Sequence, residues 1–336
     1  MILLTHNIAQ HLDKPKTFAK ILFVDFSSAF NTMRPSTLIN KLETFGVDSL
    51  LRRWILSYLR DRPQNVRVGT SLSRVKHTNI GAPQGCVLSP VLFTLYTDDH
   101  RDHGEQTMII KYADDTALVG LLKAGDEHLF SDCVRNFVTQ CEDDDLTLNV
   151  AKTKEMVIDF RKNTTHDHTV INNQEVERVS EYKYLGVFVQ DDLKWSTHLT
   201  YQTKKATQRL YHLRKLREFQ VVRSIQILFY ASTIESVLLY GSLVWGGSCS
   251  NEDRRKLLRV TRNCEKVISV TLEPWSQPWE KRTVKKAREI FNELSHPLNS
   301  QYQLLPSQRR LRLPASRTSR FKKSFIPNSI SFLNKL

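Results

Sequence analysis

Residues 108–122 read Met-Ile-Ile-Lys-Tyr-Ala-Asp-Asp-Thr-Ala-Leu-Val-Gly-Leu-Leu. Two short apolar runs flank a Tyr-Ala-Asp-Asp sequence at residues 112–115. Apolar runs of this length on either side of a polar turn are typical of a β-hairpin. The sequence therefore predicts a hairpin that carries two adjacent carboxylates, Asp114 and Asp115, at its tip.

A further carboxylate follows a second apolar run. Residues 21–24 (Ile-Leu-Phe-Val) are wholly apolar and come directly before Asp25, which is typical of a buried strand ending in an exposed acid. Mg²⁺ takes oxygen ligands in strict octahedral geometry, so carboxylates on rigid strands suit it. If the two strands are neighbours in one sheet, Asp25 and Asp114 can hold the two ions, roughly 4 Å apart, of a phosphoryl or nucleotidyl transfer site.

Each of these acids also has a plainer interpretation. An aspartate after an apolar strand is common, and an Asp-Asp pair at a turn often serves only local hydrogen bonding. Other acidic groups, at residues 98–99, 143–145 and 191–192, lie at predicted helix ends or turns, and we interpret them in that way.

The bulk composition favours a folded protein with a polyanionic partner. The 336 residues are 40% hydrophobic and 25% charged, which is ordinary for two or three globular units. The chain has 49 Lys and Arg but only 35 Asp and Glu, so its formal charge is +14. An excess of positive charge of this size favours nucleic acid as the partner. Five scattered cysteines without a C-x-x-C pair indicate a reducing compartment.

Neither a leader nor a membrane span is expected. The first residues lack the basic and apolar regions of a signal peptide. The most apolar later stretch, residues 229–245, contains Glu235 and is too short to cross a bilayer, so it predicts a buried helix.

The apolar spacing predicts a mixed α+β architecture. A glycine-containing loop at residues 81–85 is expected to precede a helix, and the pattern beyond Trp195 becomes helical and basic. The other expected elements are a helical region at residues 37–60 divided at Gly46, a short alternating stretch at residues 66–69, helices at residues 88–95 and 127–140, and strands at residues 156–160, 169–171 and 184–189.

The order of the motifs resembles that of reverse transcriptases, most closely the non-LTR (LINE-type) retrotransposon polymerases of vertebrates. The stretches that carry the resemblance are Val-Asp-Phe-Ser-Ser-Ala-Phe (24–30, motif A), Gly-Ala-Pro-Gln-Gly-Cys-Val-Leu-Ser-Pro (81–90, motif B), Tyr-Ala-Asp-Asp (112–115, motif C), Asn-Val-Ala-Lys-Thr-Lys (149–154, motif D) and Tyr-Leu-Gly-Val (184–187, motif E). His-Pro-Leu at 296–298 and Leu-Leu-Pro-Ser at 304–307 extend it over nearly the whole chain.

The resemblance implies a role for several side chains. Asp25 and Asp114 would be the principal ligands of two Mg²⁺ ions, with Mn²⁺ as a substitute, and Asp115 a further or transient ligand. Phe26 would lie beside the metal, where its carbonyl can reach an ion. Phe30 falls where the family places a steric gate against the 2′-hydroxyl of a ribonucleotide; its alternative role is that of a core aromatic.

Other positions would contact the nucleotide or the nucleic acid. Gln84 and Gly85 match positions that approach the incoming nucleotide and the template. Lys152 or Lys154 would give a proton to the leaving pyrophosphate, although either is equally a candidate for a solvated surface lysine. Trp195 and the basic helix after it would begin a thumb that holds the duplex through its phosphates.

The resemblance also implies a domain plan. Residues 1–20 would be the remnant of a fingers region in an N-terminally truncated chain, and residues 21–194 the palm, an antiparallel sheet with packed helices. Residues 195–293 would be a mostly helical thumb or connection, and residues 294–336 an extended basic tail. The fingers that normally grip the triphosphate, and an upstream endonuclease, would be absent or nearly so.

Four hypotheses follow. The first is an RNA-directed DNA polymerase that uses an RNA template, a DNA primer and deoxynucleoside triphosphates, with access to the nucleus. The second is a catalytically inactive remnant that binds nucleic acid. The third, an RNA-directed RNA polymerase, usually needs a polar residue where Phe30 stands. The fourth is a likeness of residues 152–195 to a short segment of AlkB-like proteins, for which the chain lacks a dioxygenase's His and Asp ligand pattern.

Overall fold

The computed structural model describes residues 1–101 and 104–336. Its contacts divide the chain into two compact units. We call residues 18–157 and 161–179 the sheet unit, and residues 1–17, 158–160 and 180–336 the helical unit. The mixed α+β class predicted from the sequence is confirmed.

The sheet unit is built on five strands in the order β11-β8-β1-β7-β6. β6 and β7 are antiparallel, and β11 runs parallel to β8. All eight residues of β1 are buried, which is the pattern of a strand covered on both faces. The strand bounds are β1 (Thr17–Val24), β6 (Thr107–Tyr112), β7 (Asp115–Lys123), β8 (Lys154–Ile158) and β11 (Glu177–Arg178).

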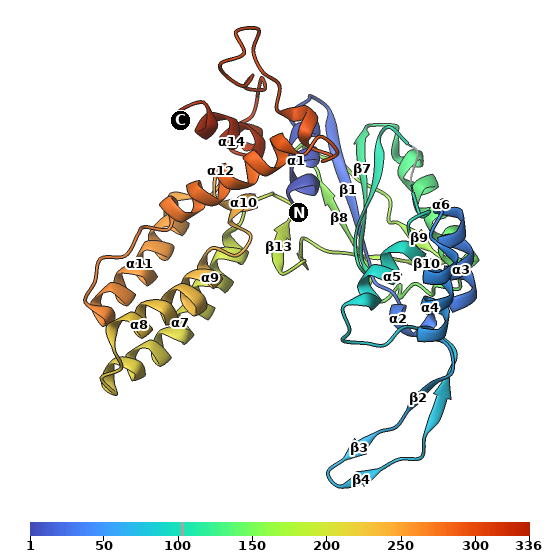
Figure 1. Ribbon diagram of the computed structural model, residues 1–336. Coiled ribbons are helices and arrows are strands. Elements are labelled where there is room, and N and C mark those ends of the chain that lie inside the picture. The colour runs from blue at the N-terminus through green and yellow to red at the C-terminus, as the bar shows by residue number, and fades with distance from the viewer. Residues whose placement is uncertain (102–103) are drawn as a thin grey trace. The chain divides into compact units, whose positions relative to one another are not determined.

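A layer of helices covers this sheet (Figure 1). The hydrophobic core between the sheet and the helices contains Phe18 and Leu22 from β1, and Phe93 and Phe137 from the helices. The helices are α2 (Ala29–Thr32), α3 (Pro35–Thr44), α4 (Ser49–Leu59), α5 (Leu88–Tyr96) and α6 (Glu127–Asp143). The hairpin, the strand before Asp25 and the helix after the glycine loop are therefore confirmed.

The predicted break at Gly46 has a clear physical cause. Gly46 has a φ of +74°, and the amide of Val47 donates to the carbonyl of Leu42, as in a Schellman C-cap. Asp48 then caps α4 by accepting from the amide of Leu50 at 2.8 Å. One helix thus ends and the next begins within four residues.

Between α4 and α5 the chain forms a long two-stranded ribbon (Figure 1). β2 (Arg62–Gln64) pairs with β5 (Lys76–Thr78), and β3 (Arg67–Val68) pairs with β4 (Ser71–Leu72). The sequence predicted only the short stretch that contains β3. The small ladder of β9 (Val170–Ile171) and β10 (Gln174–Glu175) completes the strands of this unit.

The helical unit buries its own aromatic core around Trp195 and Trp245. Its strands form a hairpin, β12 (Glu181–Tyr184) with β13 (Val187–Gln190). Its helices are α1 (Ile2–His11), α7 (Ser196–Glu218), α8 (Arg223–Phe229), the π-helix η1 (Tyr230–Glu235), α9 (Ser236–Leu238), α10 (Ser242–Trp245), α11 (Asn251–Ile268), α12 (Ser276–Asn292), the 3-10 helix η2 (Asn299–Gln301), α13 (Ser319–Lys322) and α14 (Phe325–Leu333).

Three predictions for this unit are corrected. Residues 184–189 are not one strand, because Leu185 and Gly186 have positive φ values and turn the chain between β12 and β13. Residues 229–245 are not one helix, because η1 and Gly241 interrupt it. The stretch from 294 to 336 is not an extended tail: α13 and α14 form in it, and they bury Phe325 and Ile326.

No helix within the described parts of the chain combines the length and apolarity needed to span a bilayer.

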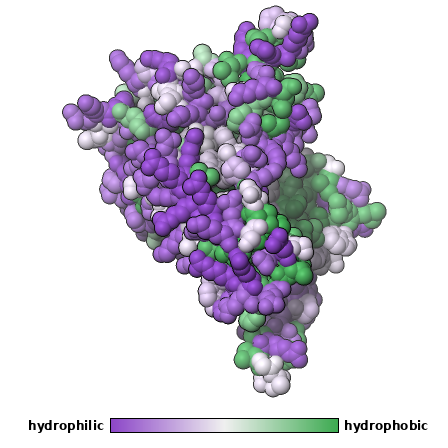
Figure 2. Space-filling view, turned by 90° about the vertical axis from the view of Figure 1, so that its left-hand side faces the viewer, coloured by the Kyte–Doolittle hydropathy of each residue, from purple (hydrophilic) through white to green (hydrophobic). Residues whose placement is uncertain are grey.

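The face of the molecule seen in Figure 2 is mostly hydrophilic, with hydrophobic residues in smaller patches.

Candidate active site

The fold brings the three predicted carboxylates together. Asp25 directly follows β1, and Asp115 begins β7, the neighbour of β1 in the sheet. In the hairpin, Tyr112 pairs with Asp115, which leaves Ala113 and Asp114 as the two turn residues. Ala113 has a φ of +54°, so it takes the left-handed conformation that a tight hairpin turn requires.

The negative charges of Asp114 and Asp25 act on Asp115. The pKa of Asp115 is raised, first by burial and then by the negative charges of Asp114 and Asp25. Like charges raise a carboxyl pKa in this way only at short range. The site is therefore a focus of negative charge.

The backbone of Asp25 is fixed by a distant segment. The amide of Asn149 donates to the carbonyl of Asp25 at 2.8 Å. The amide of Asp25 donates to the hydroxyl of Thr153 at 3.3 Å, and this hydroxyl donates to the carbonyl of Asn149 at 2.9 Å. Thr153 is fully buried. The motif D-like segment thus holds Asp25 in place, a role that the sequence did not reveal.

One carboxylate oxygen of Asp25 fits a cation. Its Oδ2 is buried and accepts no hydrogen bond from any of the described residues. No hydrogen bond compensates the burial of this oxygen, and the ammonium of Lys152, 3.9 Å away, is too distant to donate one, so the oxygen can accept a cation. Together with Asp114 and Asp115 it forms an all-oxygen donor set, which fits a hard divalent ion such as Mg²⁺ or Mn²⁺.

The two candidate lysines lie in different surroundings. The ammonium of Lys152 is 3.9 Å from Oδ2 of Asp25 and its side chain is 71% exposed. The ammonium of Lys154 instead pairs with Glu177 at 2.7 Å and donates to the carbonyl of Ala151 at 2.7 Å. The structure therefore brings Lys152, but not Lys154, to the carboxylates.

The aromatic side chains after Asp25 pack on α5. Phe30 and Phe26 have ring centroids 5.3 and 5.9 Å from that of Phe93. Both are partly buried against the core of the sheet unit. Phe26 also forms an isolated antiparallel bridge with Leu148. Phe30 is therefore held firmly in place, as either a gate or a core aromatic requires.

The glycine loop (residues 81–85) is hydrogen-bonded to the segment that contains Phe30. The amide of Ala82 donates to the carbonyl of Phe30 at 2.7 Å, and Nε2 of Gln84 to Oδ1 of Asn31 at 3.3 Å. A Cβ at Gly81 would lie 2.6 Å from the carbonyl oxygen of Phe30, so only glycine fits there. Gly85, with a φ of +78°, has open space around it. The fold thus places Gln84 near Phe30.

A second acidic cluster was misjudged from the sequence. The prediction of simple turn chemistry is wrong for Asp144, which is buried and accepts from Nε2 of His100 at 2.6 Å. Asp99, His100 and Asp144 have ligand atoms within 4.8 Å of one another. The ammonium of Lys41 contacts both aspartates, so it supplies the positive charge of a salt-bridge network.

Burial raises the pKa of Asp144, but hydrogen bonds from His100 and Lys41 outweigh it, and the net effect is a lowered pKa. The sequence held no local signal for this network, because Lys41 and Asp144 are 103 residues apart.

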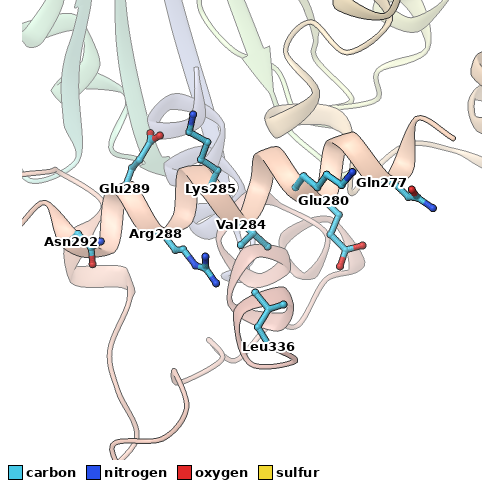
Figure 3. A pocket seen from close by; sticks show the side chains of 9 residues that line it. Gln277, Glu280, Val284, Lys285, Arg288, Glu289, Asn292 and Leu336 are labelled. Atoms are coloured by element: carbon cyan, nitrogen blue, oxygen red, sulfur yellow. The ribbon is translucent and has the colours of Figure 1, made fainter. Parts of the chain in front are cut away.

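A groove of about 670 Å³ runs along α12 in the helical unit (Figure 3). The two acids Glu280 and Glu289 line it together with the three bases Lys281, Lys285 and Arg288. The groove contains none of the predicted site residues, and its mixed charges select neither a cation nor a polyanion.

Comparison with known proteins identifies the class. Residues 2–189 match the family "Reverse transcriptase (RNA-dependent DNA polymerase)". This is more than half of the chain, and the chain belongs to that family. A shorter match, residues 195–236, is to "Alkylated DNA repair protein alkB homolog 8, N-terminal". It begins at residue 195, where the range 152–195 expected from the sequence ends, and covers α7, α8 and η1.

The relatives are mobile-element polymerases. The chain is 28% identical over 277 residues to the probable RNA-directed DNA polymerase from transposon BS of Drosophila melanogaster, covering 76% of the chain and 30% of the relative. It is 24% identical over 305 residues to that from mobile element jockey of the same species, covering 87% and 32%. The predicted likeness to non-LTR retrotransposon reverse transcriptases is confirmed, although the chain spans only about a third of the length of these relatives.

Solved structures with similarity include telomerases. Telomerase from Candida albicans with a fragment of telomeric RNA has a TM-score of 0.39 at 14% identity, covering 87% of this chain and 51% of the other. Apo telomerase from Candida tropicalis has a TM-score of 0.42 at 9% identity, covering 88% and 53%.

The role of Thr153 gives a first prediction. Thr153→Val removes the hydroxyl that accepts from the amide of Asp25, in a place where water cannot replace it. We expect the free energy of unfolding in urea to fall by about 1–3 kcal/mol, and the Asp25 amide to exchange its hydrogen faster. Thr153→Ser keeps the hydroxyl and serves as the control. Equal exchange rates at Asp25 in the two variants would contradict the assignment.

Proposed function

We propose that this chain carries the nucleotidyl-transfer site of an RNA-directed DNA polymerase. It would extend the 3′ end of a DNA primer on an RNA template, with deoxynucleoside triphosphates as substrates. The observation that carries the proposal is the convergence of Asp25, Asp114 and Asp115 at the ends of neighbouring strands. Membership of the reverse transcriptase family supports the same chemistry.

Asp25 and Asp114 are the proposed principal ligands of two Mg²⁺ ions, with Asp115 as a further ligand and the carbonyl of Phe26 beside them. Bound there, the ions would neutralise phosphate oxygens and lower the pKa of the attacking hydroxyl. The contribution of the chain is pre-organisation. Hydrogen bonds from Asn149 and to Thr153 fix the backbone of Asp25 before any ion binds.

Lys152 is the proposed proton donor to the leaving pyrophosphate. Its exposed ammonium, 3.9 Å from a site carboxylate, is free to turn toward a substrate. Lys154 is the weaker candidate, because Glu177 and a backbone carbonyl already occupy its ammonium. A donor must reach the atom it protonates, so position decides between the two.

Phe30 is the proposed gate, and Gln84 and Gly85 are the proposed contacts to the incoming nucleotide and the template. The packing of Phe30 on Phe93 supports a gate, because a steric filter must be held rigidly. The open space at Gly85 supports a close approach of its backbone to a base.

Residues 195–293, which lie within the helical unit, are the proposed thumb. Between α7 and α11 lies a groove of about 530 Å³ lined by Lys204, Lys256 and Arg259 together with threonine, glutamine and asparagine side chains. The side chains that line it include no acid. The ammonium of Lys256 forms a salt bridge with the carboxylate of Glu252 at 3.0 Å. Lys204 and Arg259 are therefore the stronger candidates for phosphate contacts. Hydroxyl, amide and cationic groups are those that bind a nucleic-acid backbone irrespective of sequence.

The metal-ligand role is tested by Asp114→Asn, measured as extension of an oligo(dT) primer on an RNA template. Loss of one metal-binding carboxylate should abolish Mg²⁺-dependent extension. Template binding should stay nearly unchanged, because the basic side chains proposed to bind nucleic acid are different residues. Asp132→Asn, an exposed change on α6, should extend normally.

Equal extension by Asp114→Asn and the unchanged chain would refute the ligand role. Binding without extension by the unchanged chain would favour the alternative of an inactive, nucleic-acid-binding module.

The gate is tested by Phe30→Ala. Removing the ring should raise ribonucleotide incorporation relative to deoxynucleotide incorporation by about tenfold or more, which corresponds to about 1.4 kcal/mol or more of lost discrimination. The ratio is measured in one reaction with both nucleotides, so a loss of stability lowers both rates alike. Phe45→Ala, an exposed change at the end of α3, is the control. An unchanged ratio would show that Phe30 is a core aromatic.

A further inference from the structure

The ribbon between α4 and α5, which we call the arm (residues 61–79), carries none of the predicted site residues. Two ladders build it, and they join through a backbone hydrogen bond from Ser73 to the carbonyl of Val66 at 2.9 Å. Gly69, with a φ of +59°, lies in the turn at its tip. Figure 1 shows the arm projecting from the end of α4 and away from the helices of the sheet unit.

The root of the arm is firmly fixed. The guanidinium of Arg62 donates to the carbonyls of Leu59 at 3.1 Å, Ile80 at 2.6 Å and Gly81 at 2.9 Å. The amide of Asp61 donates to the side chain of Asn79 at 2.8 Å. These contacts join the arm to α4 and to the start of the glycine loop, so it leaves the unit in a defined direction.

Beyond the root the arm has no core. Val66 and Val68 are 65% and 74% exposed, and Leu72 and Val75 are more than half exposed. A lone two-stranded ribbon is at best marginally stable in water, because neither face buries apolar area. An element that is anchored at its root and unsupported beyond it is suited to bind a partner.

The charge of the arm selects that partner. Its outer part carries Arg67, Arg74 and Lys76, and the one acid in residues 61–79, Asp61, lies at the root and contacts Nδ1 of His77 at 2.9 Å. Three cations in a stretch whose one acid lies at its root are complementary to a polyanion. A two-stranded ribbon also fits the major groove of B-form DNA, whereas the major groove of A-form duplexes is too deep and narrow.

We propose that the arm binds double-stranded B-form DNA, with Arg67, Arg74 and Lys76 contacting phosphates. This goes beyond the proposed polymerase function, because it assigns the chain a contact with duplex DNA that is separate from the carboxylate site. It requires neither metal nor nucleotide.

The test measures binding of the full chain to a fluorescent DNA duplex by anisotropy, in EDTA and without nucleotide, over a range of salt concentrations. The arm variant is Arg67→Gln, Arg74→Gln and Lys76→Gln combined. Each lost phosphate contact lowers the slope of log affinity against log salt by about 0.9. We therefore expect the slope to fall by about three and the affinity at moderate salt by at least about tenfold.

The matched control is Arg53→Gln, Lys123→Gln and Lys162→Gln combined, which removes the same charge from exposed positions of the sheet unit. It should bind the duplex nearly as the unchanged chain does. Equal losses in the two triple variants, or no loss in the arm variant, would overturn the proposal. An equal loss on an RNA duplex of the same sequence would overturn the assignment to B-form DNA.

Because the assay contains no metal, its result is independent of primer extension. Failure of the arm proposal would leave the carboxylate site untouched, and an inactive site would not prevent binding by the arm.

Discussion

Repulsion among three carboxylates is the constraint on which the rest of the site depends. Asp25, Asp114 and Asp115 carry like charges, and burial together with this repulsion raises the pKa of Asp115. The sheet opposes the repulsion by pairing the strands that carry them and by burying β1 along its whole length. The favourable packing and strand pairing of the sheet thus keep the three carboxylates close together, although they repel one another when no cation is bound.

The support around Asp25 explains why the neighbouring motifs occur together. Asn149 and Thr153 hold its backbone from one side, and the segment that follows it reaches Phe30 and the glycine loop. A displacement of Asp25 would therefore also shift Phe30 and Gln84. Residues that are far apart along the chain form one connected scaffold around the carboxylates.

Local patterns in the sequence were enough to predict the parts of this scaffold but not their contacts. The hairpin, the strand before Asp25 and the break at Gly46 each depend on a few adjacent residues, so the sequence revealed them. The hydrogen bond between Asp25 and Thr153 spans 128 residues, and no local pattern records it. The helix at residues 325–333 was missed because the surrounding basic residues and prolines hid its apolar spacing.

Iron-directed backbone cleavage tests whether Asp25, Asp114 and Asp115 bind a divalent ion. Fe²⁺ shares the preference of Mg²⁺ for carboxylate oxygens when no softer ligand is present, and with ascorbate and peroxide it cuts the backbone close to where it binds. We expect cuts near residues 25 and 114 and in the segment 149–153, and we expect excess Mg²⁺ to suppress them. A lack of cuts near residues 25 and 114, or cuts there that excess Mg²⁺ does not suppress, would contradict the metal-ligand role of these carboxylates.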